Sequence, residues 1–312
     1  MAELITSAHG RAGTQHRDIM MKSQSAMEYL MTYGWAILII AVVLSVLFQL
    51  GVFSSGNFQP HAQAGACQVS RTVAGVSLEG QCNGLLPQYV AGFNNAQTSN
   101  IMTPLPTTAT YGTTISAWFY QTGASDIGGI FYLGSTPEYP NSNGYGLVAV
   151  SQSSALCSNT APEIAVLESS LGWDCFSALP YNIDRWNNVV LVTPQNGANV
   201  NYDLYLNGVS TAINNVGGGK TPQGDAIIGG TTEIDPYQGY ISNVQLYNTT
   251  LSPSEVQALY LEGIGGAPIR PQNLVGWWPL NGNANDYSGN NNNGQLNSVT
   301  FSSSWESGYT AP

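Results

Sequence analysis

Hydrophobic residues gather in one long run near the amino terminus and in many short runs further along the chain. The long run, Trp35–Phe53, has 19 residues and no charged side chain. That is about the length of a helix that crosses the hydrocarbon core of a membrane. The short runs alternate apolar and polar residues, as in residues 202–206, and Gly, Asn, Ser and Pro separate them. The pattern predicts one apolar helix followed by a body of β-strands.

The body is expected to be a β-sandwich or jelly roll, because short strands recur regularly between turn residues. The predicted strands include residues 113–121, 128–134, 144–152, 186–193, 202–210, 226–230 and 239–248. Asn207-Gly208 predicts a tight hairpin turn, since both residues tolerate positive φ. One helix is expected in the body, where Ser252 and Glu255 have the spacing of a capping box around Pro253.

Composition narrows the functions open to the chain. Its 312 residues leave room for one sizeable domain with an appended segment, or for two small domains. Only 8% of the residues are charged, and the formal net charge is −11. The basic residues after the apolar run are Arg71, Arg185, Lys220 and Arg270, which are not clustered in the sequence. Nucleic acid is therefore not an expected partner, because a phosphate backbone needs clustered Lys and Arg.

The cysteines indicate disulfides rather than a metal site. Cys67, Cys82, Cys157 and Cys175 all follow the apolar run, none belongs to a CxxC pair, and no histidine lies near them. An even count in an exported body favours disulfides. Cys67–Cys82 with Cys157–Cys175 is the simplest of three connectivities, and buried free thiols are the alternative.

The residues that precede the apolar run form its most specific motif. Lys22 is followed by Gln24-Ser25-Ala26-Met27-Glu28-Tyr29-Leu30, and Glu28 is the one charge between Gln24 and Phe53. An acid at the head of an apolar helix is costly in lipid and normally has a partner. The basic Lys22 before the run indicates that the leader lies on the inner side of the membrane and that everything after Phe53 lies on the outer side.

This motif resembles the class III signal peptide of archaeal type IV pilin-like proteins. The resemblance implies that a prepilin peptidase cuts between Ser23 and Gln24. It also implies that Gln24 and Glu28 act in assembly, where the acid neutralises the amino terminus of a neighbouring subunit and the apolar helices bundle into a filament. The implied partners are identical subunits in a helical filament, the pilus assembly machinery and, before assembly, the membrane. A plain membrane anchor is the alternative for any apolar run of this length.

The domain boundaries follow from these motifs. We expect a leader at 1–23, an apolar helix at 24–53, a linker at 54–65, the sandwich at 66–265 and a carboxyl-terminal segment at 266–312. Residues 1–20 do not fit a leader of this kind, so Met20 or Met21 is a candidate translation start.

Several strands of the body resemble the laminin-G-like branch of concanavalin A-like jelly rolls over most of residues 88–263. The matching segments are ISAWFY around Trp118, RWNNVVLV around Trp186, YDLYLNG, and GYISNVQLYNTTLSPSEVQALY. The implied fold is a mainly β jelly-roll sandwich preceded by one long apolar helix. Residues 274–296 resemble the first strand of that fold, although they come last. They either close their own sandwich as a circular permutation, which loop entropy favours, or add to a neighbouring subunit. A truncated second repeat is the third possibility.

Catalysis is not expected. Glu233-Ile234-Asp235-Pro236-Tyr237-Gln238 is similar to the Glu-x-Asp-x-x-Glu strand of laminarinase-type glucanases, but Gln238 replaces the last acid and Pro236 interrupts the strand. Retaining hydrolysis needs two carboxyl groups about 5 Å apart. The body also has no histidine for a catalytic triad.

Three binding or modification sites are considered. The jelly-roll resemblance implies Ca²⁺ at Asp286, in an oxygen-rich turn, although Ser242-Asn243 stands where the family usually has an acidic pair. The alternative is an Asp that stabilises its own turn. The resemblance also implies binding of surface glycans. Asn248-Thr249-Thr250 is the one glycosylation sequon.

Together these features predict a structural subunit of an archaeal type IV pilus-like filament at the cell surface, displaying a lectin-like adhesive domain. The alternative is a membrane-anchored carbohydrate-binding surface protein that does not polymerise, and a degraded glycan hydrolase comes third.

Overall fold

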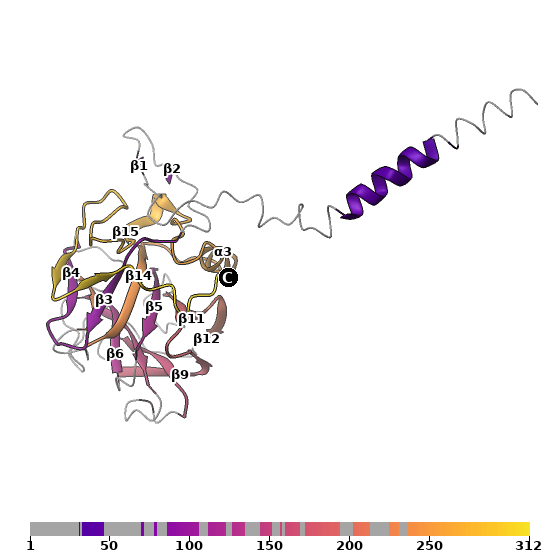
Figure 1. Ribbon diagram of the computed structural model, residues 1–312. Coiled ribbons are helices and arrows are strands. Elements are labelled where there is room, and N and C mark those ends of the chain that lie inside the picture. Colours follow the sequence, from indigo (N-terminus) through magenta and orange to yellow (C-terminus); the bar gives the residue numbers. More distant parts are fainter. Residues whose placement is uncertain are drawn as a thin grey trace, which may run out of the picture. The chain divides into compact units, whose positions relative to one another are not determined.

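The chain consists of two compact units, Met1–Pro60 and His61–Pro312. The computed structural model describes residues 31, 33–46, 70–71, 78–79, 86–105, 112–122, 127–134, 144–151, 157, 160–168, 172–193, 202–212, 225–230 and 236–312. In the first unit Met31 and residues 33–46 are helical. In the second unit most of the described residues belong to β-strands (Figure 1).

The second unit is a sandwich of two antiparallel sheets, as the sequence predicts. Counted over the described residues, the larger sheet has eight strands and the smaller has seven. The larger sheet runs in the order β12 (Val209–Ala212), β11 (Asp203–Leu206), β10 (Trp186–Val192), β5 (Thr114–Gln121), β14 (Gln238–Tyr247), β3 (Val90–Asn94) and β17 (Thr300–Ser302), with β15 (Leu274–Trp278) also on β14. The smaller sheet runs in the order β16 (Gln295–Asn297), β4 (Asn100–Thr103), β13 (Ala226–Gly229), β6 (Ile127–Gly134), β7 (Gly144–Val150), β8 (Glu163–Glu168) and β9 (Gly172–Pro180). A separate ribbon pairs β1 (Ser70–Arg71) with β2 (Leu78–Glu79).

The main hydrophobic core lies between the two sheets, and several strands contribute alternate residues to it. On β5, Ile115, Ala117 and Phe119 belong to this core, whereas Trp118 belongs to a cluster on the opposite face. This alternation follows from the period of two along a strand. Further apolar clusters cover the outer faces of both sheets. Strands β7 and β10 are consequently buried at every position, including Asn187 and Asn188 of β10.

The carboxyl-terminal segment completes the sandwich of its own chain. Strand β15 pairs with one half of β14, where Val244 lies opposite Trp278, and β3 pairs with the other half. Strand β16 pairs with β4 and strand β17 with β3, so the segment adds to both sheets. Of the alternatives for residues 274–296, the structure therefore shows closure within one chain.

A bulge in β14 holds this segment in register. Asn243 has a φ of 47°, and the pairing of β14 with β5 shifts between Ser242 and Gln245. The buried Asn243 side chain donates to the carbonyl of Gly266 at 2.9 Å and accepts from the Trp277 indole nitrogen at 2.8 Å and from Gln245 at 3.0 Å. One side chain thus connects β14, the loop after the body helix, and β15.

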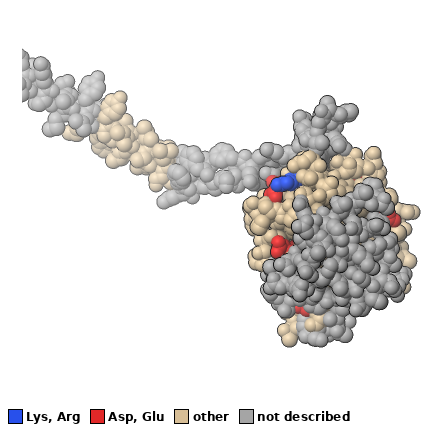
Figure 2. All heavy atoms as spheres, turned by 180° about the vertical axis from the view of Figure 1, so that it is seen from behind, with Lys and Arg blue, Asp and Glu red and all other residues tan. Residues whose placement is uncertain are grey.

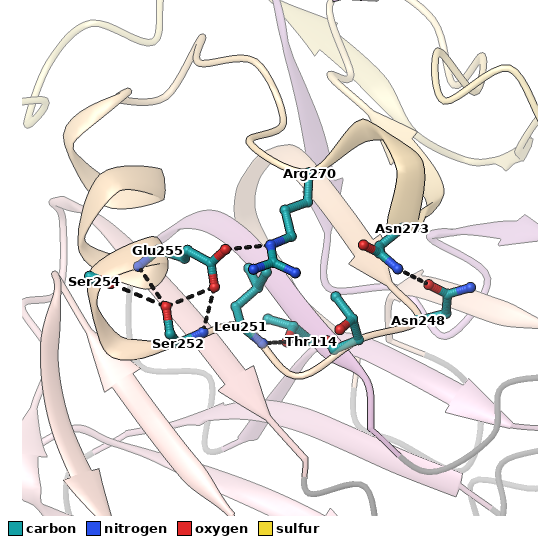
Figure 3. Close-up of polar contacts among 9 residues, drawn as sticks. Thr114, Asn248, Leu251, Ser252, Ser254, Glu255, Arg270 and Asn273 are labelled. Carbon is teal, nitrogen blue, oxygen red and sulfur yellow. Dashed lines mark hydrogen bonds and ion pairs between the residues drawn. The ribbon is translucent and has the colours of Figure 1, made fainter. Parts of the chain in front are cut away.

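The predicted capping box and hairpin turn are both confirmed. Helix α3 spans Pro253–Leu261, and the Ser252 backbone nitrogen donates to Glu255 Oε2 at 2.8 Å while the Ser252 hydroxyl accepts from the Glu255 nitrogen (Figure 3). Burial alone would raise the pKa of Glu255, but the hydrogen bonds from Ser252 and Arg270 lower it. A short 3-10 turn, η1 (Pro271–Asn273), leads into β15. Asn207 and Gly208 both have positive φ at the turn between β11 and β12.

We expect Trp278→Ala to lower the free energy of unfolding by about 3–5 kcal/mol, the usual range for deleting a large buried aromatic side chain. Trp278 is fully buried, and its indole nitrogen donates to the carbonyl of Asn292 at 2.8 Å. Urea denaturation followed by circular dichroism measures the change. Val209→Ala, at a side chain that is 58% exposed, is the control and should change stability by about 0.5 kcal/mol or less. Equal effects of the two variants would contradict a structural role for β15.

Candidate functional site

The helical residues of the first unit expose apolar side chains on opposite sides. At 3.6 residues per turn, Ile37, Ile40 and Leu44 share one side, and their exposed fractions are 62%, 58% and 43%. Trp35 and Ile39, on the other side, are 66% and 58% exposed. A helix on the surface of a globular protein normally has one apolar stripe and one polar face. This helix therefore has no side suited to water.

The extent of this helix differs from the expectation of one long helix over residues 24–53. The described helical residues are 31 and 33–46, a shorter stretch, and the rest of 24–53 lies outside the described residues. Within the part of the chain that the structure describes, no helix combines the length and apolarity needed to cross a membrane.

Most of the predicted processing, assembly and disulfide residues cannot be placed. Ser23, Gln24, Glu28, Cys67 and Cys82 lie outside the described residues. The backbone of Cys175 lies in β9, opposite Ala165 of β8. Cys157 is disulfide-bonded. Its partner is not among the side chains that the structure describes, so the connectivity stays a prediction.

A cluster of aromatic rings covers part of the outer face of the larger sheet, and we call it the aromatic face. Its members come from β5, β10 and β14, from helix α3, and from the tail after β17: Trp118, Tyr120, Trp186, Tyr240, Tyr260, Trp305 and Tyr309. Trp118 stacks on Tyr260 with ring centroids 5.9 Å apart. Trp186 meets Trp305 edge to face at 5.7 Å. Rings in such geometries add to the stability that burial of their area provides.

The carboxyl-terminal tail closes one side of the aromatic face. The Trp186 indole nitrogen donates to the carbonyl of Trp305 at 2.9 Å, and the Trp305 indole nitrogen donates to the carbonyl of Pro87 at 3.1 Å. The Trp186 backbone nitrogen donates to the carbonyl of Gly308 at 3.1 Å. Gly308 has a φ of +80°, and an added Cβ would come within 2.7 Å of the carbonyl oxygen of Asp184. The tail therefore fits closely against the strands beneath it.

Two tyrosines at the edge of the aromatic face are only partly buried. The rings of Tyr120 and Tyr240 lie 5.8 Å apart, and the exposed Asp184 lies near Tyr120. Burial raises the pKa of Tyr120, and the nearby Asp184 and Tyr240 raise it further. The Tyr120 hydroxyl consequently remains protonated at neutral pH and can donate a hydrogen bond. A partly accessible ring with a hydroxyl and a charged neighbour can bind a ligand that has one apolar face and polar groups around its edge.

Asp286 is the centre of a loop that its own carboxylate organises. Oδ1 accepts from the backbone nitrogens of Trp277 at 3.0 Å and Ser288 at 2.8 Å. Oδ2 accepts from the Ser288 hydroxyl at 2.8 Å and the Asn292 nitrogen at 2.9 Å. Both oxygens are therefore engaged by donors of the protein, which is the geometry of a turn-stabilising Asp. These four hydrogen bonds favour a structural role for Asp286. Among the described residues no group of three or more His, Cys, Asp or Glu side chains could hold a metal ion.

The glucanase-like segment is only partly described by the structure. Glu233, Ile234 and Asp235 lie outside the described residues. Tyr237 is fully buried in the core, and Gln238 begins β14 opposite Asn94.

Charged side chains are sparse on the second unit. The face in Figure 2 shows few Lys, Arg, Asp or Glu residues. Within the described residues the one ion pair joins Arg270 to Glu255 at the start of α3.

Comparison with known proteins places the fold within a family of lectin-like jelly rolls. Residues 94–257, more than half of the chain, match the family described as the concanavalin A-like lectin/glucanases superfamily, of the laminin G type. The chain therefore belongs to this superfamily, as the strand motifs of the sequence predict. No curated protein sequence is significantly similar to the chain.

Solved structures support the same fold. One is a heptameric SAP-like pentraxin from Limulus polyphemus, with a TM-score of 0.51 and 16% identity, covering 68% of this chain and 94% of the pentraxin. Another is a proposed carbohydrate-binding protein from Bacteroides ovatus, with a TM-score of 0.51 and 15% identity, covering 69% of this chain and 60% of that protein. At these identities the likeness concerns the fold alone.

Several residues of the aromatic face are not identified from the sequence. Trp305 and Tyr309 lie in a tail without strand pattern, and only the folded chain brings them onto β5 and β10. Trp118 and Tyr120 could have been assigned to one face, because residues two apart on a strand point the same way. Asn243 was noted only as a departure from the family pattern, yet it connects three segments.

We expect Asp286→Asn to lower the free energy of unfolding by about 1–3 kcal/mol, because an amide NH₂ would face donors that now meet a carboxylate oxygen. Tyr287→Ala, at the next and 38% exposed side chain, is the control. Thermal unfolding followed by circular dichroism measures both. Because protein donors occupy both Asp286 oxygens, Ca²⁺ should leave the melting temperature of the parent protein unchanged. A rise with Ca²⁺ that Asp286→Asn abolishes would contradict this role.

Proposed function

We propose that this protein is a subunit of a type IV pilus-like filament at the cell surface, which assembles through residues 24–53 and displays a lectin-like jelly roll. The observation that carries the proposal is the helix at residues 33–46, whose opposite sides both expose large apolar side chains. Such a helix requires apolar neighbours on every side, and a bundle of identical helices in a filament core supplies them.

The position of Glu28 favours a filament over a plain anchor. Lipid would satisfy the apolar side chains of the helix, but it would leave the carboxylate of Glu28 without a partner. Cleavage between Ser23 and Gln24 would create an amino group four residues away from this acid in each subunit. In a staggered bundle the amine of one subunit can neutralise the acid of the next, so both charges are paired only in the assembled state.

The jelly roll supports a division of roles in which the helix assembles the filament and the sandwich is displayed. Its carboxyl-terminal segment pairs with strands of its own chain, so the sandwich does not need a donated strand to be complete. Its outer faces are covered by apolar clusters, by helix α3 and by the tail. The apolar helix is then the segment that requires other subunits, and the body is free to face the surroundings.

We expect Glu28→Gln to abolish filaments while leaving the protein in the membrane, because the substitution removes the charge and keeps the side-chain size. Glu28→Asp keeps the carboxylate and should retain at least part of assembly. Negative-stain microscopy of sheared surface material, with mass spectrometry of the amino terminus, measures the outcome. The mature parent protein should begin at Gln24. A surface protein that retains residues before Gln24 would overturn the filament proposal.

The second candidate is a membrane-anchored carbohydrate-binding protein that does not polymerise. It is supported by membership of a superfamily of lectins and glucanases and by the partly buried Tyr120 and Tyr240, with Asp184 near Tyr120. A tyrosine ring can pack against the apolar face of a sugar while its hydroxyl and the neighbouring charges meet the sugar hydroxyls.

If this edge of the aromatic face binds glycans, Tyr240→Ala should weaken binding about tenfold, the equivalent of one lost ring contact. Tyr287→Ala removes a ring from a different part of the chain and should leave binding unchanged. A glycan array identifies the ligand, and isothermal titration calorimetry with that ligand compares the variants. The absence of array binding by the folded protein would favour a purely structural subunit.

A further inference from the structure

The turn between β14 and helix α3 presents one asparagine for modification. We propose that Asn248 carries an N-linked oligosaccharide on its side-chain nitrogen. The proposal rests on the surface location in the proposed function, because the oligosaccharide donor is used outside the membrane. Asn248-Thr249-Thr250 is the only Asn-x-Ser/Thr sequence in the 312 residues. The expected stoichiometry is therefore one N-linked glycan per subunit.

The geometry of Asn248 leaves its nitrogen available. The residue is exposed and directly follows the last residue of β14, Tyr247. Its Oδ1 accepts from the Asn273 side-chain nitrogen at 3.2 Å, and its backbone nitrogen donates to the carbonyl of Asn273 at 2.9 Å. These two bonds orient the side chain so that Nδ2 points away from Asn273 (Figure 3). A substituent on Nδ2 would therefore not break either bond.

The rest of the sequon is tied to the sheet. The carbonyl of Thr249 accepts from the Thr114 hydroxyl at 2.8 Å, and the Thr250 hydroxyl donates to the carbonyl of Thr193 at 3.0 Å. The Leu251 nitrogen donates to the Thr114 hydroxyl at 3.1 Å. These bonds hold the two threonines against the sandwich and leave Asn248 as the exposed member of the three. The folded turn can thus carry a bulky glycan without rearrangement.

The transfer itself is a substitution at the first carbon of the sugar. The donor is an oligosaccharide linked to a polyisoprenyl phosphate carrier. A bond forms between Asn248 Nδ2 and sugar C1, and the bond between C1 and the carrier's phosphate oxygen breaks. The electron pair of that bond leaves with the phosphate, which also takes up the proton lost from the amide.

Four variants in the native host separate the modification from the structural roles of the turn. Asn248→Gln removes the acceptor nitrogen position, and Thr250→Val removes the hydroxyl that a sequon requires. Thr250→Ser keeps both the sequon and a hydroxyl for the carbonyl of Thr193. Thr249→Val changes the middle position, where a sequon accepts any residue except Pro, and leaves the backbone bond to Thr114 in place.

The readout is the mass of the proteolytic peptide that contains residues 248–250, taken from surface material. The parent protein, Thr249→Val and Thr250→Ser should show the mass of an attached oligosaccharide, and Asn248→Gln and Thr250→Val should not. An unmodified peptide from protein that begins at Gln24 and lies on the cell surface would overturn the inference. A modified peptide from protein that forms no filaments would uphold the inference while counting against the filament proposal.

Discussion

The pairing of β15 with β14 is the interaction on which the rest of the second unit depends. Strand β14 borders β5 on one side and both β3 and β15 on the other, so its complete pairing needs two segments from far apart in the chain. The buried Asn243 specifies how they meet, because its amide joins Gly266, Gln245 and Trp277. A buried polar network stabilises a structure only when its members are satisfied. A shift of β15 by one residue would break these bonds and would also turn Trp278 out of the core.

The docked carboxyl-terminal segment then determines what the outer face of the larger sheet presents. After β17 the tail places Trp305 and Tyr309 over Trp118 and Trp186, and indole-to-carbonyl hydrogen bonds hold it there. Apolar area that would otherwise face water is buried, and the four tyrosines of the aromatic face, Tyr120 and Tyr240 among them, remain partly accessible. The helix at residues 33–46 is the opposite case, because its large apolar side chains are exposed. The contrast explains why we place assembly in the helix and recognition in the sandwich.

The local elements were largely predictable because their signals are local. All seven predicted strand segments occur in the structure, as do the Ser252 capping box and the turn at Asn207-Gly208. Strands β4 and β8 were not predicted, although each pairs along its length with two neighbours. Their short sequences carry no strong alternation, and partners from elsewhere in the chain decide that they are strands. For Asp286 the sequence left Ca²⁺ binding and a turn-stabilising role open, and the neighbours of its two oxygens favour the turn.

The sequence by itself determined the apolar helix segment, the class of fold and the single sequon. Their signals are the hydrophobic pattern, the turn residues and a three-residue motif, and each of these is a property of neighbouring positions. Only the tertiary structure decided that the last strands close their own sandwich, that the tail covers the aromatic face, and that Asn273 orients Asn248. Each of these depends on contacts between residues distant along the chain. Such contacts form according to the shape, burial and hydrogen bonding of the folded protein, and none of these has a signature in the order of neighbouring residues.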